Sequence, residues 1–244
     1  MPIDEFTALE KKYNIKYFLQ DSILLSYPKS GRTWLRMILA KILDEKGYNT
    51  EEYEMLPAFH LSIDDIKKRF GPNINVVFLH RNIGDVLLSH HHERTTSTRS
   101  GPKLNNFSIQ EFIRDENYGA VSIAKYNVKC FDSLKFFKKS KVITYEDMSQ
   151  DANSVVKEVA SFLGIGATNE EIKNAVEYSD FNNMQKIDQG KGKNYLSNYK
   201  GNFGKSPGRV RKGKVNDYLD VLEKEDVDFI KKIQEIQDEN MSNG

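Results

Sequence analysis

Three short apolar runs each precede a segment with helical periodicity. The runs cover residues 22–27, 75–80 and 141–145, and the helical segments that follow them cover residues 33–46, 83–92 and 152–163. This alternation predicts parallel strands joined by crossover helices. Functional loops in such sheets lie at the carboxyl ends of the strands, so the residues that follow the first two runs should meet at one edge. We therefore expect an α/β fold, with a central parallel sheet flanked by helices on both faces.

Further periodic segments predict helices at about residues 108–114, 119–138, 168–177 and 223–237. The last of these has Val227, Ile230 and Ile233 at helical spacing, which indicates a stripe that faces the core. Two polar stretches, residues 95–106 and 188–208, interrupt the pattern. Loops of this length in a compact domain are usually functional or disordered.

The segment between the first run and its helix, residues 27–34, reads Y-P-K-S-G-R-T-W. A turn that opens a helix presents unpaired backbone N–H groups and the positive end of the helix dipole. Cationic and hydroxyl side chains surround Gly31, whose lack of a side chain lets the backbone approach a ligand closely. The segment therefore predicts a phosphate cradle. The ordinary P-loop, G-x-x-x-x-G-K-[ST], is absent, because the single lysine, Lys29, precedes the glycine.

Four later segments also contain residue types that suit a nucleotide with phosphate groups. They read R-N-I-G-D-V-L-L-S at residues 81–89, Y-E-D-M at 145–148, S-D-F-N-N-M at 179–184 and R-K-G-K-V-N-D-Y at 211–218. Together with the cradle, their order resembles that of the soluble, cytosolic-type sulfotransferases that use 3′-phosphoadenosine 5′-phosphosulfate (PAPS). The resemblance spans Tyr27 to Tyr218 and departs from the family at Asn216, where glycine is usual, and at Tyr218, where tryptophan is usual. It implies a P-loop-like sheet, PAPS as cosubstrate and adenosine 3′,5′-bisphosphate (PAP) as product.

The resemblance also implies which residues bind the nucleotide. The cradle would hold the 5′-phosphosulfate, the segments at 81–89 and 211–218 the 3′-phosphate, and the aromatic residues of the other two segments the adenine. The implied binding residues are Lys29, Ser30, Gly31, Arg32, Thr33, Trp34, Arg81, Ser89, Tyr145, Ser179, Phe181, Arg211, Lys212 and Gly213.

Three residues are implied in the chemistry. Lys29 can donate to the oxygen that bridges sulfur and phosphate as that oxygen becomes anionic, or it can simply bind the phosphate in the ground state. In the family, a serine at the position of Ser89 holds this lysine away until the acceptor binds. A hydroxyl acceptor needs a base, and His60 lies between the first helix and the second strand, as the family's base does. The segment around His60 departs from the family, because Ala58 replaces a lysine and the expected proline is absent.

A cluster of histidines, His90, His91 and His92, is the alternative source of a base, followed by an acidic residue such as Glu93. Adjacent residues on a helix point in different directions, so the three histidines do not form a metal site. No other spacing in the chain indicates metal ligands, and the family's reaction requires no metal.

The length of 244 residues fits one domain, residues 1–244, with a core of ordinary size. Residues 186–214 hold nine Lys and Arg against one acid, Asp188, a balance of nine minus one, or +8. Such a patch suits a nucleic acid, an anionic membrane or a charged nucleotide. The R-K-G sequence within it favours the nucleotide, so we expect a flexible basic lid and no partnership with nucleic acid or membrane.

Cys130 is the only cysteine, which suits a reducing compartment. The amino-terminal residues lack a signal pattern, and no apolar run approaches about 18 residues. We expect a cytoplasmic protein that is a monomer or a weak homodimer, since the dimer segment of the animal cytosolic enzymes, K-x-x-x-T-V-x-x-x-E, has no match.

Two other classes stay open from the sequence. A nucleotide kinase or triphosphatase would share the fold, although the chain lacks the P-loop lysine and a clear acidic strand end for magnesium. A non-catalytic nucleotide-binding protein would keep the cradle without the base. The acceptor, a small molecule with a hydroxyl or an amine, is not specified by any loop.

Overall fold

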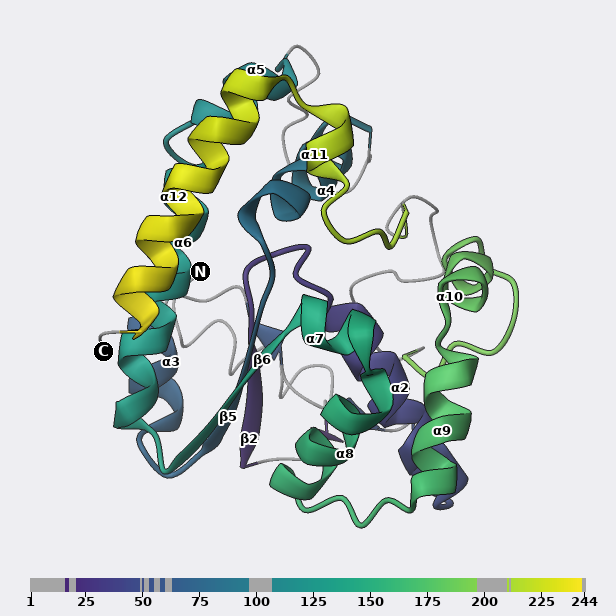
Figure 1. The fold of residues 1–244 in the computed structure, drawn as a ribbon. Coiled ribbons are helices and arrows are strands. Elements are labelled where there is room, and N and C mark those ends of the chain that lie inside the picture. Colours follow the sequence, from purple (N-terminus) through teal and green to yellow (C-terminus); the bar gives the residue numbers. More distant parts are fainter. Residues whose placement is uncertain are drawn as a thin grey trace.

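A parallel sheet lies at the centre of the protein (Figure 1). The computed structural model describes residues 16–17, 21–48, 50, 53–54, 58–59, 63–96, 107–196, 210 and 212–242. Within these ranges the strand order is β4 (Ala58–Phe59), β2 (Ser22–Leu25), β5 (Asn75–His80) and β6 (Lys139–Thr144). Each neighbouring pair is parallel. A separate parallel pair joins β1 (Lys16–Tyr17) and β3 (Tyr53–Glu54).

One face of the sheet packs against the helices that follow two of the strands. These helices are α2 (Arg32–Glu45), α8 (Ala152–Phe162) and α9 (Asn169–Tyr178). Leu24, Val77 and Ile143 point to this face and share one buried cluster with apolar side chains of the three helices. Because successive side chains of a strand point to opposite faces, the neighbouring residues Ile23 and Phe78 belong to a cluster on the other side.

The opposite face is covered by α3 (Ile63–Phe70) and α6 (Ala120–Ser133). The carboxyl-terminal α12 (Lys224–Ser242) lies along α6 (Figure 1). A third buried cluster joins α6 and α12 to α4 (Ile83–Thr96), α5 (Ile109–Arg114) and α11 (Tyr218–Val221). Helices therefore flank both faces of the sheet, and the predicted fold is confirmed.

The predicted strands and helices are present with shifted ends. The segment predicted as one helix over residues 119–138 is α6 followed by a short 3-10 helix, η1 (Leu134–Phe136). Periodicity did not predict α3 or α11. It also did not predict two short helices, α7 (Tyr145–Gln150) and α10 (Phe181–Asp188). Each begins at a side-chain cap, since Thr144 accepts from the Asp147 N–H at 2.9 Å and Asp180 from the Asn183 N–H at 2.6 Å. Helices this short are set by capping and not by an apolar repeat.

The expected flexible lid at 186–214 begins differently in the structure. Residues 186–188 form the last turn of α10, and Tyr195 and Leu196 are buried in the core cluster. Lys193 pairs with Asp44 of α2 at 3.0 Å. Residues 197–209 and Arg211 lie outside the described residues, so the lid itself stays a prediction.

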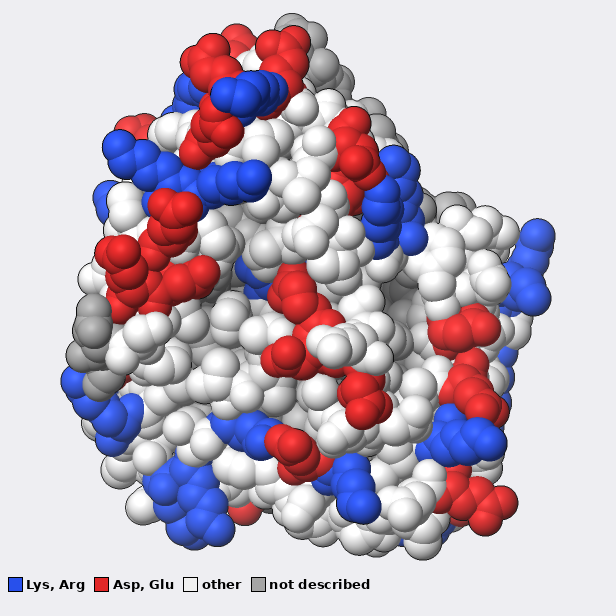
Figure 2. Space-filling view, viewed as in Figure 1, with Lys and Arg blue, Asp and Glu red and all other residues white. Residues whose placement is uncertain are grey.

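Charged side chains of both signs are interspersed on the face seen in Figure 2, most clearly over α12 at the upper left. Among the helices that the structure describes, none is both long enough and apolar enough to span a membrane.

Candidate active site

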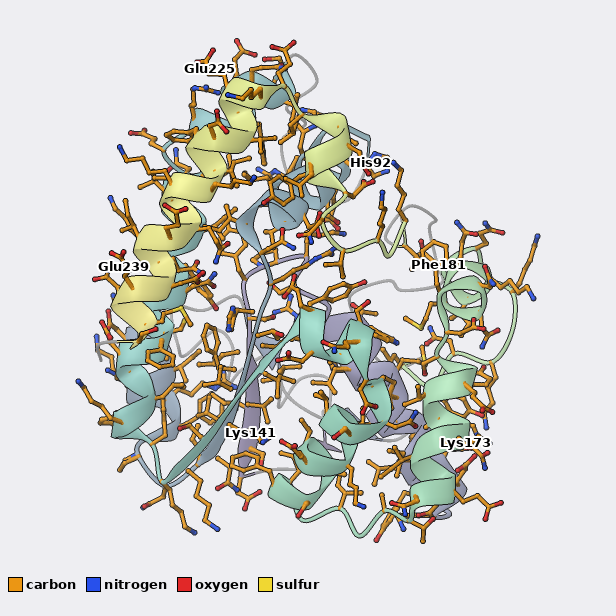
Figure 3. The ribbon with its side chains drawn as sticks, viewed as in Figure 1. His92, Lys141, Lys173, Phe181, Glu225 and Glu239 are labelled. Carbon is orange, nitrogen blue, oxygen red and sulfur yellow. The ribbon has the colours of Figure 1, made fainter. Side chains whose placement is uncertain are left out.

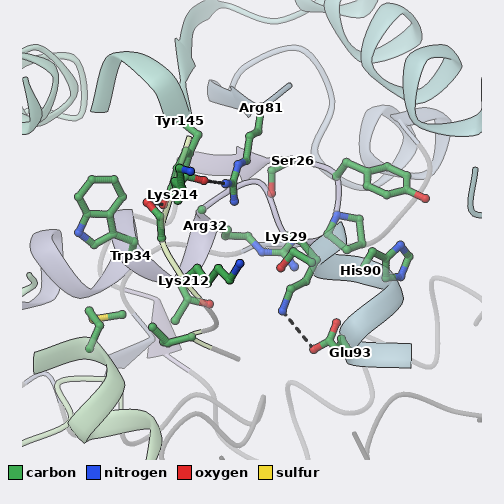
Figure 4. Close-up of a pocket in the computed structure, with 18 of the residues that line it drawn as sticks. Ser26, Lys29, Arg32, Trp34, Arg81, His90, Glu93, Tyr145, Lys212 and Lys214 are labelled. Atoms are coloured by element: carbon green, nitrogen blue, oxygen red, sulfur yellow. Dashed lines mark hydrogen bonds and ion pairs between the residues drawn. The ribbon is translucent and has the colours of Figure 1, made fainter. Parts of the chain in front are cut away.

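A cavity of about 880 Å³ opens where β2 and β5 end (Figure 4). It brings together most of the residues that the sequence assigned to nucleotide binding. The predicted residues that line it are Lys29, Gly31, Arg32, Thr33, Trp34, Arg81, Ser89, Tyr145, Ser179, Phe181, Lys212 and Gly213. Ser30 is instead buried beneath the cradle, and His60 and Arg211 lie outside the described residues.

The cradle is a turn with two left-handed residues. Lys29 has φ of 74° and Gly31 has φ of 98°. Gly31 occupies the N-cap of α2 and has no side chain that could cap the N–H groups of the first helical turn. The helix therefore begins at the cavity with backbone donors and the positive end of its dipole available to an anion, as the sequence predicted.

Gly31 is also a point of close approach. A Cβ atom added there would lie 2.5 Å from Cδ2 of Tyr145. We expect Gly31→Ala to destabilise the fold by about 1–3 kcal/mol, from backbone strain together with displacement of the tyrosine. PAP binding should weaken as well, because Tyr145 borders the cavity. Denaturant unfolding and calorimetric titration with PAP measure the two effects.

Gly47 supplies the matched control for this prediction. It has φ of 82°, and a Cβ atom added there would meet nothing within 4 Å. Gly47→Ala should therefore show the backbone strain alone, with PAP affinity unchanged. Equal losses of stability in the two variants, with normal PAP binding in both, would contradict a packing role for Gly31.

Tyr145 is the centre of an aromatic and cationic stack. The Arg81 guanidinium lies 3.9 Å from the centroid of its ring, and the Trp34 ring lies 5.6 Å away (Figure 4). The Tyr145 hydroxyl donates to the carbonyl of Gly213 at 3.3 Å. Burial raises the pKa of Tyr145, so the ring stays a neutral phenol at physiological pH. The stack joins the end of β5, the start of α2 and the carboxyl-terminal segment around one wall.

Asp85 connects the 3′-phosphate segment to the carboxyl-terminal segment. Its carboxylate is fully buried and accepts from the Arg81 guanidinium at 3.1 Å and from the Asn82 amide at 2.9 Å. It also accepts from the backbone N–H groups of Asn216 at 2.8 Å and Tyr218 at 3.3 Å. The buried charge is therefore paired and hydrogen-bonded, which is the condition for keeping a carboxylate out of water.

The two departures from the resembled pattern both fit this turn. Asn216 has φ of 61°, a left-handed conformation that asparagine tolerates better than other residues with a side chain. The Tyr218 ring lies directly on Gly84 of α4, where an added Cβ atom would come within 2.3 Å of it. The turn is therefore kept although neither glycine nor tryptophan is present.

Phe181 and Lys212 close the other side of the cavity. Phe181 stands at the N-terminal end of α10 (Figure 3), and its ring lies against Gly213, where an added Cβ atom would be 2.6 Å away. Lys212 pairs with Asp217 at 3.2 Å, and its side chain is about half exposed. An aromatic face and a cation are thus placed beside each other, which suits an adenine next to a phosphate.

Lys29 meets a carboxylate that the pattern of segments did not assign. The Lys29 Nζ lies 3.7 Å from Glu93 Oε1, and the two side chains are 11% and 19% exposed (Figure 4). Glu93 follows Ser89 by one turn of α4, and both residues line the cavity. A carboxylate therefore lies beside Lys29 in the cavity, and the pairing of Lys29 with Ser89 stays a prediction.

His90 and His91 point in different directions, as predicted for adjacent residues on a helix. His90 is buried and lines the cavity, while the His91 ring lies 2.8 Å from the carbonyl oxygen of Phe107. Burial lowers the pKa of His90 to about 4, so its imidazole is neutral at physiological pH. Within the described ranges, no group of three or more His, Cys, Asp or Glu side chains could hold a metal ion.

Aromatic side chains form the end of the cavity beyond Lys29. The Tyr27 ring meets His90 edge-on at 5.8 Å and Tyr126 at 5.4 Å. Tyr118 lies 5.8 Å from His90 and accepts a hydrogen bond from Arg94 at 2.7 Å. No sequence pattern indicated this wall, because Tyr118 and Tyr126 belong to a segment that reads only as a turn and a core helix.

Comparison with known proteins gives one family. The family model described as the sulfotransferase domain matches residues 48–244. The rabbit (Oryctolagus cuniculus) amine sulfotransferase is 26% identical over 247 residues, which cover 88% of this chain and 79% of the relative. Cytosolic sulfotransferase 14 of Arabidopsis thaliana is 24% identical, with 90% of this chain and 75% of the relative covered.

Solved structures agree in fold. A mouse sulfotransferase complexed with PAP superposes with a TM-score of 0.68 at 20% identity, covering 90% of this chain and 85% of the other. Retinol dehydratase in complex with androsterone and PAP superposes with a TM-score of 0.64 at 16% identity, covering 92% and 82%.

Proposed function

The chain belongs to the sulfotransferase domain family, and from this premise we propose that it moves the sulfuryl group of PAPS to a hydroxyl or an amine of a small molecule. The observation that carries the proposal is the convergence of five separate segments on one cavity. Three of the segments contribute hydrogen-bond donors and cations for the phosphate groups of the nucleotide, and the other two contribute aromatic rings for its adenine. Solved structures of similar proteins contain PAP, which supports PAPS as the sulfuryl donor.

In this proposal, PAPS binds in one orientation. Its 5′-phosphosulfate lies on the cradle at the start of α2, where Lys29, Arg32 and Thr33 add donors to the backbone N–H groups. Its 3′-phosphate lies between Arg81 and the segment that contains Lys212, and its adenine lies near Phe181. Ser89 supports the 3′-phosphate.

Transfer then proceeds in line. The acceptor attacks sulfur, the bond from sulfur to the bridging oxygen breaks, and its electron pair stays on the oxygen of the 5′-phosphate. Lys29 donates to that oxygen as its charge grows. For a hydroxyl acceptor, we propose His60 as the base that takes the proton. The reaction needs no metal.

Incubation with PAPS and a metabolite extract tests the proposed function. Mass spectrometry should detect products that gain a sulfo group, together with PAP. Release of ADP from ATP in a magnesium-dependent reaction, with no sulfo products, would instead support a nucleotide kinase. Binding of PAP without any transfer would support a non-catalytic nucleotide-binding protein.

The assignment of the 3′-phosphate predicts a selective loss of affinity. Arg81→Ala should weaken PAP binding by about 1.5–3 kcal/mol, since it removes a charge-assisted contact. Binding of adenosine 5′-phosphate should change far less, because that nucleotide lacks the 3′-phosphate. Arg211→Ala is expected to behave in the same way. Calorimetric titration of both nucleotides gives the difference.

Arg114→Ala is the control for the arginine variants. Its guanidinium pairs with Glu225 at 3.3 Å and with Asp226, and Arg114 does not line the cavity. Its loss should leave the affinity for both nucleotides unchanged. Equal weakening of PAP and adenosine 5′-phosphate in Arg81→Ala would show that the arginine acts away from the 3′-phosphate.

The proposal extends to the cellular compartment and to the binding partners of the protein. We place the protein in the cytoplasm, as the name of the Arabidopsis relative states for that protein. Its partner is a small-molecule acceptor, with no role for nucleic acid or membrane. We expect a monomer or a weak homodimer, which size-exclusion chromatography with light scattering would measure.

A further inference from the structure

Glu93 differs in charge from the other ionisable side chains of the cavity. Among the described residues that line it, Glu93 is the one carboxylate. The lysines and arginines that line the cavity are Lys29, Arg32, Arg81, Arg94, Lys212 and Lys214. These cations would attract the anionic PAPS, whereas a carboxylate near its phosphosulfate would repel it. The position of Glu93 therefore needs an explanation other than donor binding.

The ion pair with Lys29 does not persist through the proposed reaction. Lys29 Nζ lies 3.7 Å from Glu93 Oε1 in the structure, while transfer requires Lys29 at the bridging oxygen of the donor. When Lys29 moves to the donor, Glu93 loses this partner at a site where its side chain is only 19% exposed. A carboxylate with so little water around it is costly unless another cation replaces the lysine.

The surroundings of Glu93 suit an organic cation. Tyr27, Tyr118 and Tyr126 also line the cavity, and the Tyr27 and Tyr118 rings lie against His90, which precedes Glu93 by about one turn of α4. Burial raises the pKa of Tyr27 to about 12 and lowers that of His90 to about 4, so both rings are uncharged at physiological pH. Aromatic rings attract ammonium groups through their π faces. The Arg94 guanidinium lies over the Tyr118 ring at 4.6 Å and donates to the Tyr118 hydroxyl at 2.7 Å.

We propose that Glu93 binds the acceptor, and that the acceptor is an amine that enters as its ammonium ion. The inference rests on the proposed function and narrows its acceptor from a hydroxyl or an amine to an amine. The aromatic wall formed by Tyr27, Tyr118 and Tyr126 holds the apolar part of the acceptor. Glu93 is then a binding residue and also the first recipient of a proton from the nitrogen.

Transfer to an amine involves two proton transfers and one exchange of bonds at sulfur. The ammonium gives one proton to the Glu93 carboxylate and becomes a neutral amine. The nitrogen attacks sulfur, so the N–S bond forms while the bond from sulfur to the bridging oxygen breaks, with its electron pair left on the 5′-phosphate beside Lys29. The sulfonated nitrogen releases its second proton to water.

Matched pairs of acceptors test the inference. Tryptamine with tryptophol, and 2-phenylethylamine with 2-phenylethanol, differ only in the nucleophile and its charge. The measurement is kcat/KM from release of PAP at fixed PAPS. The wild type should favour the amine of each pair. Glu93→Gln, which keeps the shape and removes the charge, should lower kcat/KM for the amines roughly 10- to 100-fold, with a rise in KM. The alcohols should change little, and Glu93→Asp should restore part of the amine activity.

Glu45→Gln is the control variant. Glu45 pairs with Lys41 at 2.6 Å, and its side chain is 21% exposed, but it lies at the far end of α2. It should keep the amine preference. The inference is overturned if the wild type prefers the alcohols, turns over no amine, or loses no amine preference in Glu93→Gln. Titration with PAP separates these results from failure of the proposed function, in which the wild type would bind no PAP and release none from PAPS with any acceptor.

Discussion

Lys29→Ala should lower turnover by roughly 100- to 1000-fold, the cost of removing one donor that meets a developing oxyanion. Lys29 projects from the cradle turn into the cavity (Figure 4), where its side chain is 11% exposed. An ammonium group in such a poorly solvated place interacts strongly with charge that appears during the reaction. The neutral methyl group of alanine cannot replace it, and water has little access. Release of PAP at saturating PAPS and acceptor measures the loss.

The fold should survive this substitution. Lys29 already has a positive φ of 74°, and alanine at that position bears a similar backbone cost. Lys41→Ala is the matched control, since Lys41 also pairs with a glutamate and its side chain is 16% exposed, but at the far end of α2. It should keep normal turnover with a small loss of stability. Turnover of Lys29→Ala near that of the wild type would remove the lysine from the mechanism.

Asp85→Ala should destabilise the protein by about 3–5 kcal/mol, because it leaves the buried cation of Arg81 without its carboxylate. Arg81 is only 8% exposed, so water replaces the lost partner poorly. The N–H groups of Asn216 and Tyr218 lose their acceptor in the same change. The carboxyl-terminal segment is then no longer held beside α4, and PAP binding should fall together with stability. Urea unfolding and PAP titration at low temperature measure both.

Two further variants make this prediction specific. Asp85→Asn keeps the shape and part of the hydrogen bonding but not the charge, so its loss of stability should be smaller. Asp220→Ala removes a carboxylate from the same segment, where it pairs with Lys214 on the surface and is 63% exposed. Exposed ion pairs contribute about 0–1 kcal/mol to stability, so Asp220→Ala should leave the free energy of unfolding nearly unchanged. A similar cost for Asp85→Ala and Asp220→Ala would contradict the role of Asp85 as the buried link.

The sequence by itself determined the features that depend on neighbouring residues. The apolar runs of β2, β5 and β6 and the periodic segments after them predicted the parallel sheet with helices on both faces. The cradle at residues 27–34 was recognisable because a phosphate site at a helix N-terminus is built from one contiguous turn. The later segments were recognisable by their resemblance to the sulfotransferase family, and the rule that strand ends share an edge placed Lys29 and Arg81 at one cavity.

The tertiary structure decided which distant residues meet. Asp85 accepts a hydrogen bond from Asn216, 131 residues away, and Lys29 pairs with Glu93 of another helix. Tyr118 and Tyr126 join Tyr27 at the end of the cavity beyond Lys29. No local pattern encodes such contacts, because they arise from the packing of α4 and α6 beside the cradle. The residues that we propose for nucleotide binding therefore lie in short segments that the sequence reveals. The buried link at Asp85 and the aromatic wall beyond Lys29 exist only once the chain has folded.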